Sequence, residues 1–267
     1  IGNGVVVDPK VLLDELKYIK EKGINPKLVV SDRAHVIMPY HISMDNALSN
    51  HQGKLAAGST GKGIAPVYAD KMFRNGIRMI DLLDPNVFEE KLEKGYLFSK
   101  KIIEGALLQK FDTPMHEILE NYLYYGEQLS PYICDTSVEL YTAYQNGKSI
   151  LFEGAQGISL DVDHGIYPYT TSSNTATGHI STGTGVTFRT INRVIGVVNG
   201  YLSRVGESPL PTEINGTEAE LLRAKGGEYG TTTGRPRRIG WLDLVQIRQA
   251  VRVNGLTEIA LTKLDIL

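Results

Sequence analysis

The 267-residue sequence is poor in cysteine, in long apolar runs and in excess charge. Its only cysteine, Cys134, excludes an internal disulfide. No apolar run approaches the ~18 residues of a membrane-spanning helix and no secretory segment is visible, so we expect a cytoplasmic protein without a membrane partner. Lys and Arg number 28 against 30 Asp and Glu, a net charge of -2. This balance disfavours general nucleic-acid binding, so no nucleic-acid partner is expected.

Metal-binding patterns are also missing. None of the six histidines stands with carboxylates or cysteines at metal-ligand spacing, so no metal site is predicted within this chain. His164, in the segment DVDHG, is the most suggestive of them, and we interpret it as structural. Internal repeats and low-complexity tracts are absent, whereas 42% hydrophobic residues suffice for a substantial core. The first and last segments read as strands without a lead-in or a continuation, so we expect part of a longer protein.

The order of the predicted elements indicates an α/β fold. Asp8 and Pro9 form a helix start, and Gly23 ends that helix. Residues 85–144 are predicted to be a mainly helical subregion. The segments 147–157, 193–206 and 258–265 read as apolar strands, and 241–255 as an amphipathic helix closed by Gly255. Non-alternating strands separated by helices predict a single domain over residues 1–267, with a mainly parallel central sheet flanked by helices. Ligands of such sheets bind in the loops after the strands.

Two loops rich in small and hydroxyl residues are candidates for binding. GSTGKG (58–63) fits either a plain turn or a phosphate cradle with Ser59 and Thr60, and it is not a Walker A motif. Gln156 directly follows a predicted strand among small residues, so another group can approach its amide closely. An amide both donates and accepts hydrogen bonds, which suits a purine edge. Residues 170–174 add hydroxyls and an amide nearby in the sequence.

The segment TTTGRPRR (231–238) places three arginines on a glycine- and threonine-rich loop. Arginine grips carboxylate or phosphate with a planar fork, so Arg235, Arg237 and Arg238 indicate a site for small anions that orders around its substrate. The alternative is a solvated basic loop. An RNA-binding interpretation of RPRR is disfavoured by the net charge and by the lack of interleaved aromatic residues.

TKLD (262–265) ends the last predicted strand. Asp265 can accept from N1–H and the 2-amino group of guanine, while the stem of Lys263 lies along the purine face. Adenine lacks that pair of donors, so a site of this kind discriminates between the two bases. Four residues are a short motif, and such matches also arise by chance.

These segments, together with DKMFRNG, DVDHGIYPY, SRVG and PLPTE, occur in an order that closely resembles the adenylosuccinate synthetase family over nearly the whole chain. The resemblance implies a ligase that uses GTP to phosphorylate the 6-oxygen of IMP. L-Aspartate then displaces the phosphate to give adenylosuccinate in AMP synthesis. It also implies a single α/β domain with a guanine site like that of P-loop GTPases, a homodimer, and Mg²⁺ as cofactor.

The resemblance assigns roles to particular residues. Gln156 has a supporting catalytic role, and Arg74 reaches the partner subunit's IMP site. The implied contacts to IMP come from Thr60, Arg74, Gln156, Thr171 and Arg235. Those to aspartate come from Thr231, Thr232, Thr233, Gly234, Arg235, Pro236 and Arg237, and those to GTP from Arg237, Lys263, Leu264 and Asp265.

The chain also departs from the family pattern. It lacks the GDEGKGK phosphate loop, whose aspartate is general base and Mg²⁺ ligand, and the segment with the catalytic histidine. The Mg²⁺ ligands are therefore expected outside this chain, and the chain alone is expected to be inactive. Lys62 stands where an arginine is common, and Pro236 interrupts the arginine run. A nucleotide-binding module without catalysis is the alternative function.

Overall fold

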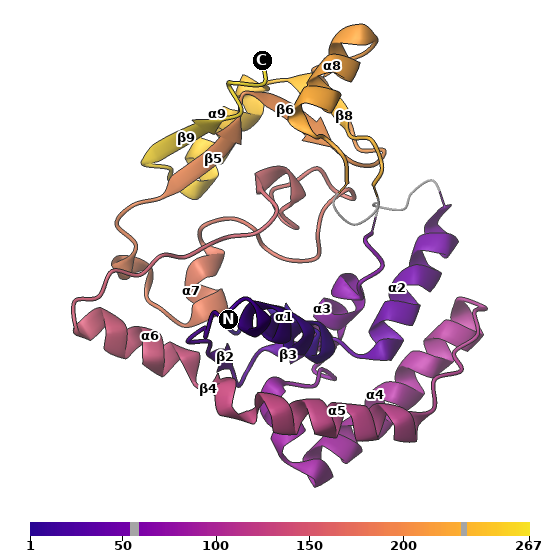
Figure 1. The fold of residues 1–267 in the computed structure, drawn as a ribbon. Coiled ribbons are helices and arrows are strands. Elements are labelled where there is room, and N and C mark those ends of the chain that lie inside the picture. The colour runs from indigo at the N-terminus through magenta and orange to yellow at the C-terminus, as the bar shows by residue number, and fades with distance from the viewer. Residues whose placement is uncertain (54–58, 231–233) are drawn as a thin grey trace. The chain divides into compact units, whose positions relative to one another are not determined.

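The computed structural model describes residues 1–53, 59–230 and 234–267, which group into two compact units. Unit 1 comprises Ile1–Lys54, Gly61–Phe152 and His179–Thr187; unit 2 comprises Leu55–Thr60, Glu153–Gly178 and Phe188–Leu267. Figure 1 shows the elements of both. The single domain expected over residues 1–267 stays a prediction.

Unit 1 is mainly helical and has two short parallel strand pairs, β1 with β3 and β2 with β4. The strands are β1 (Val6–Val7), β2 (Val30–Ser31), β3 (His35–Val36) and β4 (Ile133–Cys134). The helices are α1 (Pro9–Glu21), α2 (Pro39–Gln52), α3 (Ile64–Phe73), α4 (Pro85–Lys101), α5 (Met115–Leu129), α6 (Thr136–Gln145) and α7 (His179–Thr184). Short helical turns are η2 (Met79–Leu83), η3 (Ile102–Ala106) and η4 (Ser130–Tyr132).

The start of α1 confirms the predicted cap. Asp8 Oδ1 accepts a hydrogen bond from the Val11 amide at 3.1 Å, which satisfies one of the free N–H groups of the first turn. The predicted helical subregion is also confirmed, because α4, α5 and α6 occupy most of it. Helices α4 and α5, magenta in Figure 1, pack on each other and contribute much of the unit 1 core, including Phe88, Leu92 and Ile118.

Unit 2 holds the remaining strands and two helices. Strand β5 (Ile195–Asn199) pairs in parallel with β9 (Glu258–Thr262), although more than 50 residues separate them in the sequence. Strands β6 (Tyr201–Arg204), β8 (Arg238–Trp241) and β7 (Glu213–Ile214) form an antiparallel sheet in the order β6-β8-β7. The remaining elements are α8 (Thr217–Gly226), α9 (Leu244–Asn254), η5 (Ile158–Leu160) and η6 (Phe188–Thr190). A small core forms around Tyr201, Ala219, Leu222 and Ile239.

Two strand predictions need correction. Segment 147–157 has no strand among its residues, and Leu151 is 88% exposed. An apolar run is compatible with a strand but does not suffice for one, because a strand also needs a neighbouring strand with which to pair. None of the described residues pairs with this segment. Segment 193–206 is two strands, because the chain passes from β5 to β6 at Gly200 and enters a different sheet.

The α/β class is confirmed, since helices accompany parallel strand pairs in both units. The predictions for 241–255 and 258–265 are also confirmed by α9, which begins after its N-cap Asp243 and ends at Gly255, and by β9. No helix in the described ranges combines the length and the apolar character that are needed to cross a membrane.

Candidate functional site

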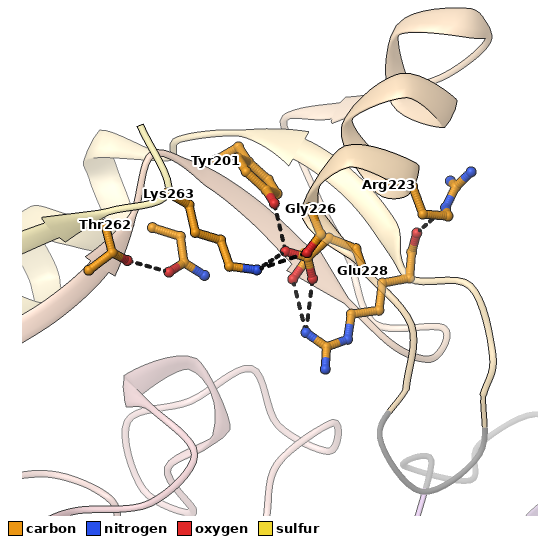
Figure 2. A network of polar contacts seen from close by, with 9 residues as sticks. Tyr201, Arg223, Gly226, Glu228, Thr262 and Lys263 are labelled. Carbon is orange, nitrogen blue, oxygen red and sulfur yellow. Dashed lines mark hydrogen bonds and ion pairs between the residues drawn. The ribbon is translucent and has the colours of Figure 1, made fainter. Parts of the chain in front are cut away.

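The buried carboxylate of Glu228 binds side chains from two of the segments that are predicted to bind ligands, the arginine-rich segment and TKLD (Figure 2). The Glu228 side chain has no exposed surface. Its Oε1 accepts from the Tyr201 hydroxyl at 2.7 Å and from the Lys263 ammonium, and its Oε2 accepts from Arg237 Nη1 at 2.9 Å. The predicted GTP residues Arg237 and Lys263 therefore meet on one acid that the sequence analysis did not single out.

The charge state of Glu228 follows from these contacts. Burial acts to raise its pKa, but hydrogen bonds from Lys263, Tyr201 and Ser203 outweigh burial and lower the pKa to about 2. The carboxylate is therefore ionised at neutral pH. Burial and the bond to Glu228 together raise the pKa of Tyr201, which keeps its hydroxyl as the donor.

The backbone holds the two sides of this cluster. Next to Glu228, the Arg237 amide donates to the Glu228 carbonyl at 2.9 Å, and Tyr229 and Pro236 form a β-bridge. Glu228 and Arg237 therefore lie opposite each other at the base of the arginine loop, which we define as residues 229–236. Arg223 Nε also binds the Arg237 carbonyl at 2.8 Å.

Lys263 follows β9 directly. The preceding Thr262 ties the end of β9 to β5, because its Oγ1 donates to Asn199 Oδ1 at 2.7 Å and its carbonyl accepts from the Gly200 amide at 2.9 Å. Beyond this tie the Lys263 ammonium reaches Glu228, and it also lies 5.8 Å from the centre of the Tyr201 ring. Leu264 and Asp265 are exposed beside it. This edge matches the expected place for a ligand, after a parallel strand.

A second buried acid organises the loop of residues 157–177, which we call the hydroxyl loop. Asp161 Oδ1 accepts from the Asp163 and His164 amides, both at 3.0 Å, and Oδ2 accepts from the Thr175 and Ala176 amides. Burial raises the Asp161 pKa, but these four backbone donors outweigh burial and lower it. One side chain thus closes both ends of the loop.

Two predicted IMP residues lie on or beside the hydroxyl loop. The Thr171 amide donates to the Leu160 carbonyl at 2.8 Å, and its Oγ1 lies 3.4 Å from Ser173 Oγ. Gln156 immediately precedes the loop and is exposed. The His164 side chain is exposed, and its backbone supports Asp161 and Gln249, in line with the structural interpretation.

Two further predicted IMP residues, Thr60 and Arg74, stand before and after α3 in the sequence. Asp45 on α2 accepts from the Gly63 amide at 2.9 Å, and buried His41 contacts Asp70 Oδ2 at 2.9 Å, so two polar contacts link α2 to α3. Arg74 is exposed at the C-terminal cap of α3. Thr60 is exposed just before the Gly61–Gly63 turn.

Backbone conformation marks several of these positions. Among the residues that the structure describes, the non-glycine positions in the left-handed region are Arg74 (φ 65°), Leu108 (φ 53°), Gln156 (φ 59°) and Lys263 (φ 56°). This conformation costs a side-chain-bearing residue about 1–2 kcal/mol. Three of the four are predicted binding residues, which suggests that this strain is retained because of the contacts that their side chains make.

The structure describes only some of the residues that are predicted to bind aspartate. Thr231, Thr232 and Thr233 lie outside the described residues, whereas Gly234, Arg235 and Pro236 are exposed on the arginine loop. Arg238, the third arginine of the motif, turns the other way and pairs with Glu213 through Nε at 2.7 Å. Arg238 therefore joins β7 to β8. The structure gives no support for its predicted role in binding small anions.

Glu228 and Asp161 were missed because their partners are distant in the sequence. Tyr201 and Lys263 lie 27 and 35 positions from Glu228. A local signal did exist for Asp161, since Asp followed by turn residues in DVDHG is typical of a side chain that binds the backbone two residues on. For Glu228 the signal was weaker: one acid between glycines at the edge of a basic loop.

Comparisons with known proteins agree over the whole chain. The adenylosuccinate synthetase family model matches residues 1–267. The chain is 49% identical to adenylosuccinate synthetase of Bacillus cereus over 271 residues and 51% identical to that of Listeria monocytogenes over 269 residues. All of this chain is covered in both alignments, but it spans only 62% of the length of each relative.

Solved structures give the same result. A fully ligated adenylosuccinate synthetase from Plasmodium falciparum superimposes with a TM-score of 0.92 at 35% identity, covering all of this chain and 62% of that one. A succinoaminodeoxyadenylate synthetase of cyanophage S-2L, bound to dGMP and dATP, gives a TM-score of 0.64 at 25% identity, covering 98% of this chain and 64% of that one.

Proposed function

The chain belongs to the adenylosuccinate synthetase family, and on that premise we propose that the whole protein joins IMP and L-aspartate at the expense of GTP. The products are adenylosuccinate, GDP and phosphate, formed through 6-phosphoryl-IMP as a step of AMP synthesis. The geometric observation that carries the proposal is the meeting of Arg237 and Lys263 on Glu228 (Figure 2). Through this contact the base of the arginine loop lies beside the end of β9, where guanine is expected to bind.

The chemistry requires two displacements. The N1 proton of IMP passes to a general base that is expected outside this chain, and the 6-oxygen attacks the γ-phosphorus of GTP. The bond from that phosphorus to the bridging oxygen breaks, and GDP leaves. The amine of aspartate then attacks C6, the C6–O bond breaks, and the oxygen departs with the phosphate while the amine loses a proton. A phosphate ester is the better leaving group, which is why the purine oxygen is activated first.

In this proposal the chain supplies recognition. The Gln156 amide binds the hypoxanthine edge and assists the reacting 6-oxygen, and Thr60 and Thr171 bind the phosphate of IMP. Arg235 and Arg237 hold carboxylate and phosphate oxygens with their planar forks, together with Gly234, Pro236 and Thr231–Thr233 of the same segment. Lys263, Leu264 and Asp265 bind the guanine of GTP, and Asp265 accepts from its N1–H and 2-amino group.

Two further parts of the proposal concern the assembly and the metal. Arg74, exposed at the end of α3, reaches the IMP site of a second copy, so the protein acts as a homodimer in the cytoplasm. Mg²⁺ neutralises phosphate charge when it is bound. The described residues contain no group of three or more His, Cys, Asp or Glu side chains that could hold a metal ion. These residues therefore do not fit a metal site of their own, and no step is assigned to one.

The test uses the full-length protein with IMP, GTP, L-aspartate and Mg²⁺, and it follows adenylosuccinate by absorbance. We expect product only when all three substrates are present. ATP in place of GTP, and dGMP in place of IMP, are the matched controls and should give little product. Full-length protein that binds GTP and IMP but makes no product would instead support the non-catalytic nucleotide-binding module.

A further inference from the structure

Glu228 occupies the junction between two segments for which different ligands are proposed. The arginine loop is proposed to bind aspartate and phosphate, and the end of β9 is proposed to bind guanine. The Glu228 carbonyl accepts from the Arg237 amide at the base of that loop. Its side chain holds the Lys263 ammonium (Figure 2). Both segments are therefore fixed to one residue.

These contacts leave the stem of Lys263 and the rest of the Arg237 guanidinium available to bind a ligand. Lys263 commits its ammonium to Glu228 and, at 3.4 Å, to the Gly226 carbonyl, so the aliphatic stem is held in a fixed direction. The Arg237 side chain binds Glu228 through Nη1, at one end of its planar fork. The Lys263 and Arg237 side chains are 33% and 30% exposed, whereas Glu228 is fully buried between them.

Such a cluster is hard to explain by stability alone. Removing charges from water costs energy that their attraction often fails to recover, and well-packed apolar residues of similar volume commonly do as well. Here one carboxylate also shares two cations, so a movement of Arg237 toward a phosphate changes the field and the hydrogen bonds that hold Lys263. This is a physical route by which the loop and the guanine edge influence each other.

We propose that Glu228 is a positioning residue that couples Arg237, which is proposed to bind aspartate and GTP, to Lys263, the lysine that orients guanine. It contacts no substrate itself. It sets the directions of Lys263 and Arg237 together, so that guanine binding at Lys263 and ligand binding at Arg237 favour each other. This inference rests on the proposed function, since the two segments must bind those ligands for the coupling to have an effect.

The test compares full-length wild-type protein with Glu228→Gln, which keeps the size of the side chain and removes its charge. We expect the KM values for GTP and for aspartate each to rise about tenfold or more, with the KM for IMP changed less than about twofold. Discrimination between GTP and ITP, which lacks the 2-amino group, should fall as well. A merely structural role predicts instead a lower yield of active protein with unchanged KM values.

Glu213→Gln is the matched control. Glu213 also pairs with an arginine of the same antiparallel sheet, but its partner is Arg238, and it reaches neither Arg237 nor Lys263. We expect its KM values and its base discrimination to match the wild type. If Glu213→Gln raised the same KM values as Glu228→Gln, the effect would be a general loosening of the sheet and the proposal would be wrong.

Further variants keep the test decisive. Combining Glu228→Gln with Lys263→Ala should raise the KM for GTP no more than Lys263→Ala alone, because coupled residues are non-additive. If Glu228→Gln does not fold, Tyr201→Phe removes one hydrogen bond from the carboxylate and should raise the same two KM values about two- to fivefold. Unchanged KM values in the folded variant, in an active wild-type background, overturn the inference. An inactive wild type overturns the proposed function.

Discussion

Three candidate binding residues combine a functional side chain with a backbone conformation that only glycine adopts freely. Gln156 is the clearest case, because it is exposed, has a φ of 59° and precedes the hydroxyl loop. Nothing in its amide chemistry requires this conformation. Tertiary structure imposes it, and a sequence pattern that treats Gln156 as an ordinary strand end gives no sign of it.

This conformation makes a prediction about stability and activity at position 156. Because glycine tolerates a positive φ and alanine does not, Gln156→Gly should be more stable than Gln156→Ala by about 1 kcal/mol, the reverse of the usual order. Both variants lose the amide, and kcat/KM should fall about 10- to 100-fold for two lost hydrogen bonds. Chemical unfolding and steady-state kinetics of the full-length variants measure the two effects. A more stable alanine variant would contradict the backbone assignment, and full activity would remove Gln156 from the site.

At the scale of elements, one acid side chain binds four backbone amides of the hydroxyl loop. Strands and helices satisfy their own backbone groups, but a loop of this length must satisfy them otherwise. Asp161 does so for four amides, two near each end of the loop. The loop that carries Thr171 is therefore ordered by a residue for which no substrate contact is proposed.

Replacing this acid should disorder the loop and weaken IMP binding. In Asp161→Asn one oxygen becomes an NH₂ group that faces two amide donors, so about 2–4 kcal/mol of stability should be lost. We expect faster proteolysis within residues 157–177 and a higher KM for IMP, with the KM for GTP little changed.

The neighbouring Asp163→Asn is the control for that experiment, because exposed Asp163 accepts only from the Asn174 side chain among the contacts seen here. It should resemble the wild type in proteolysis and kinetics. Equal cleavage rates for Asp161→Asn and wild type would show that the loop is held by something other than Asp161.

At the scale of the whole molecule, each unit contains a buried ionisable group whose pKa is lowered far into the acid range. In unit 1, burial together with the positive charges of Lys71 and Arg78 lowers the pKa of His35 to about 4 from 6.5. In unit 2, Glu228 has a pKa of about 2 against 4.5 when unperturbed. His35 becomes protonated at a higher pH than Glu228. As the pH falls, unit 1 should therefore lose stability before unit 2.

The sign is the same for both groups. Each binds its proton more weakly in the folded state, so stability falls as the pH drops from the unfolded pKa to the folded pKa. A shift of this size corresponds to about 3 kcal/mol for each group. We expect the loss from His35 between about pH 6.5 and 4, and the loss from Glu228 between about pH 4.5 and 2.

Thermal unfolding of the full-length protein as a function of pH checks this prediction. His35→Gln should flatten the dependence in the upper range only, and Glu228→Gln in the lower range only. A profile in which either variant flattened both ranges, or neither, would show that other groups control acid stability.

The sequence alone determined the class of fold and several of its elements, and it supplied the segments for which ligand binding is proposed. Helix α1 followed from Asp8 and Pro9, α9 from its periodicity and Gly255, and β9 from an apolar run. These succeeded because caps, periodicity and turn residues act over a few neighbouring positions. The prediction for 147–157 failed because a strand also depends on a partner elsewhere in the chain.

Only the tertiary structure decided which charges share an environment. The two acids that organise the candidate site, Glu228 and Asp161, are held by groups up to 35 positions away. The pKa of a buried carboxylate is the difference between a desolvation cost and the donors that surround it, and neither can be counted along the chain. For the same reason the arginine motif did not reveal that Arg237 faces Glu228 whereas its neighbour Arg238 faces Glu213. Arg237 precedes β8 and Arg238 is its first residue, and segments distant in the sequence supply their different partners.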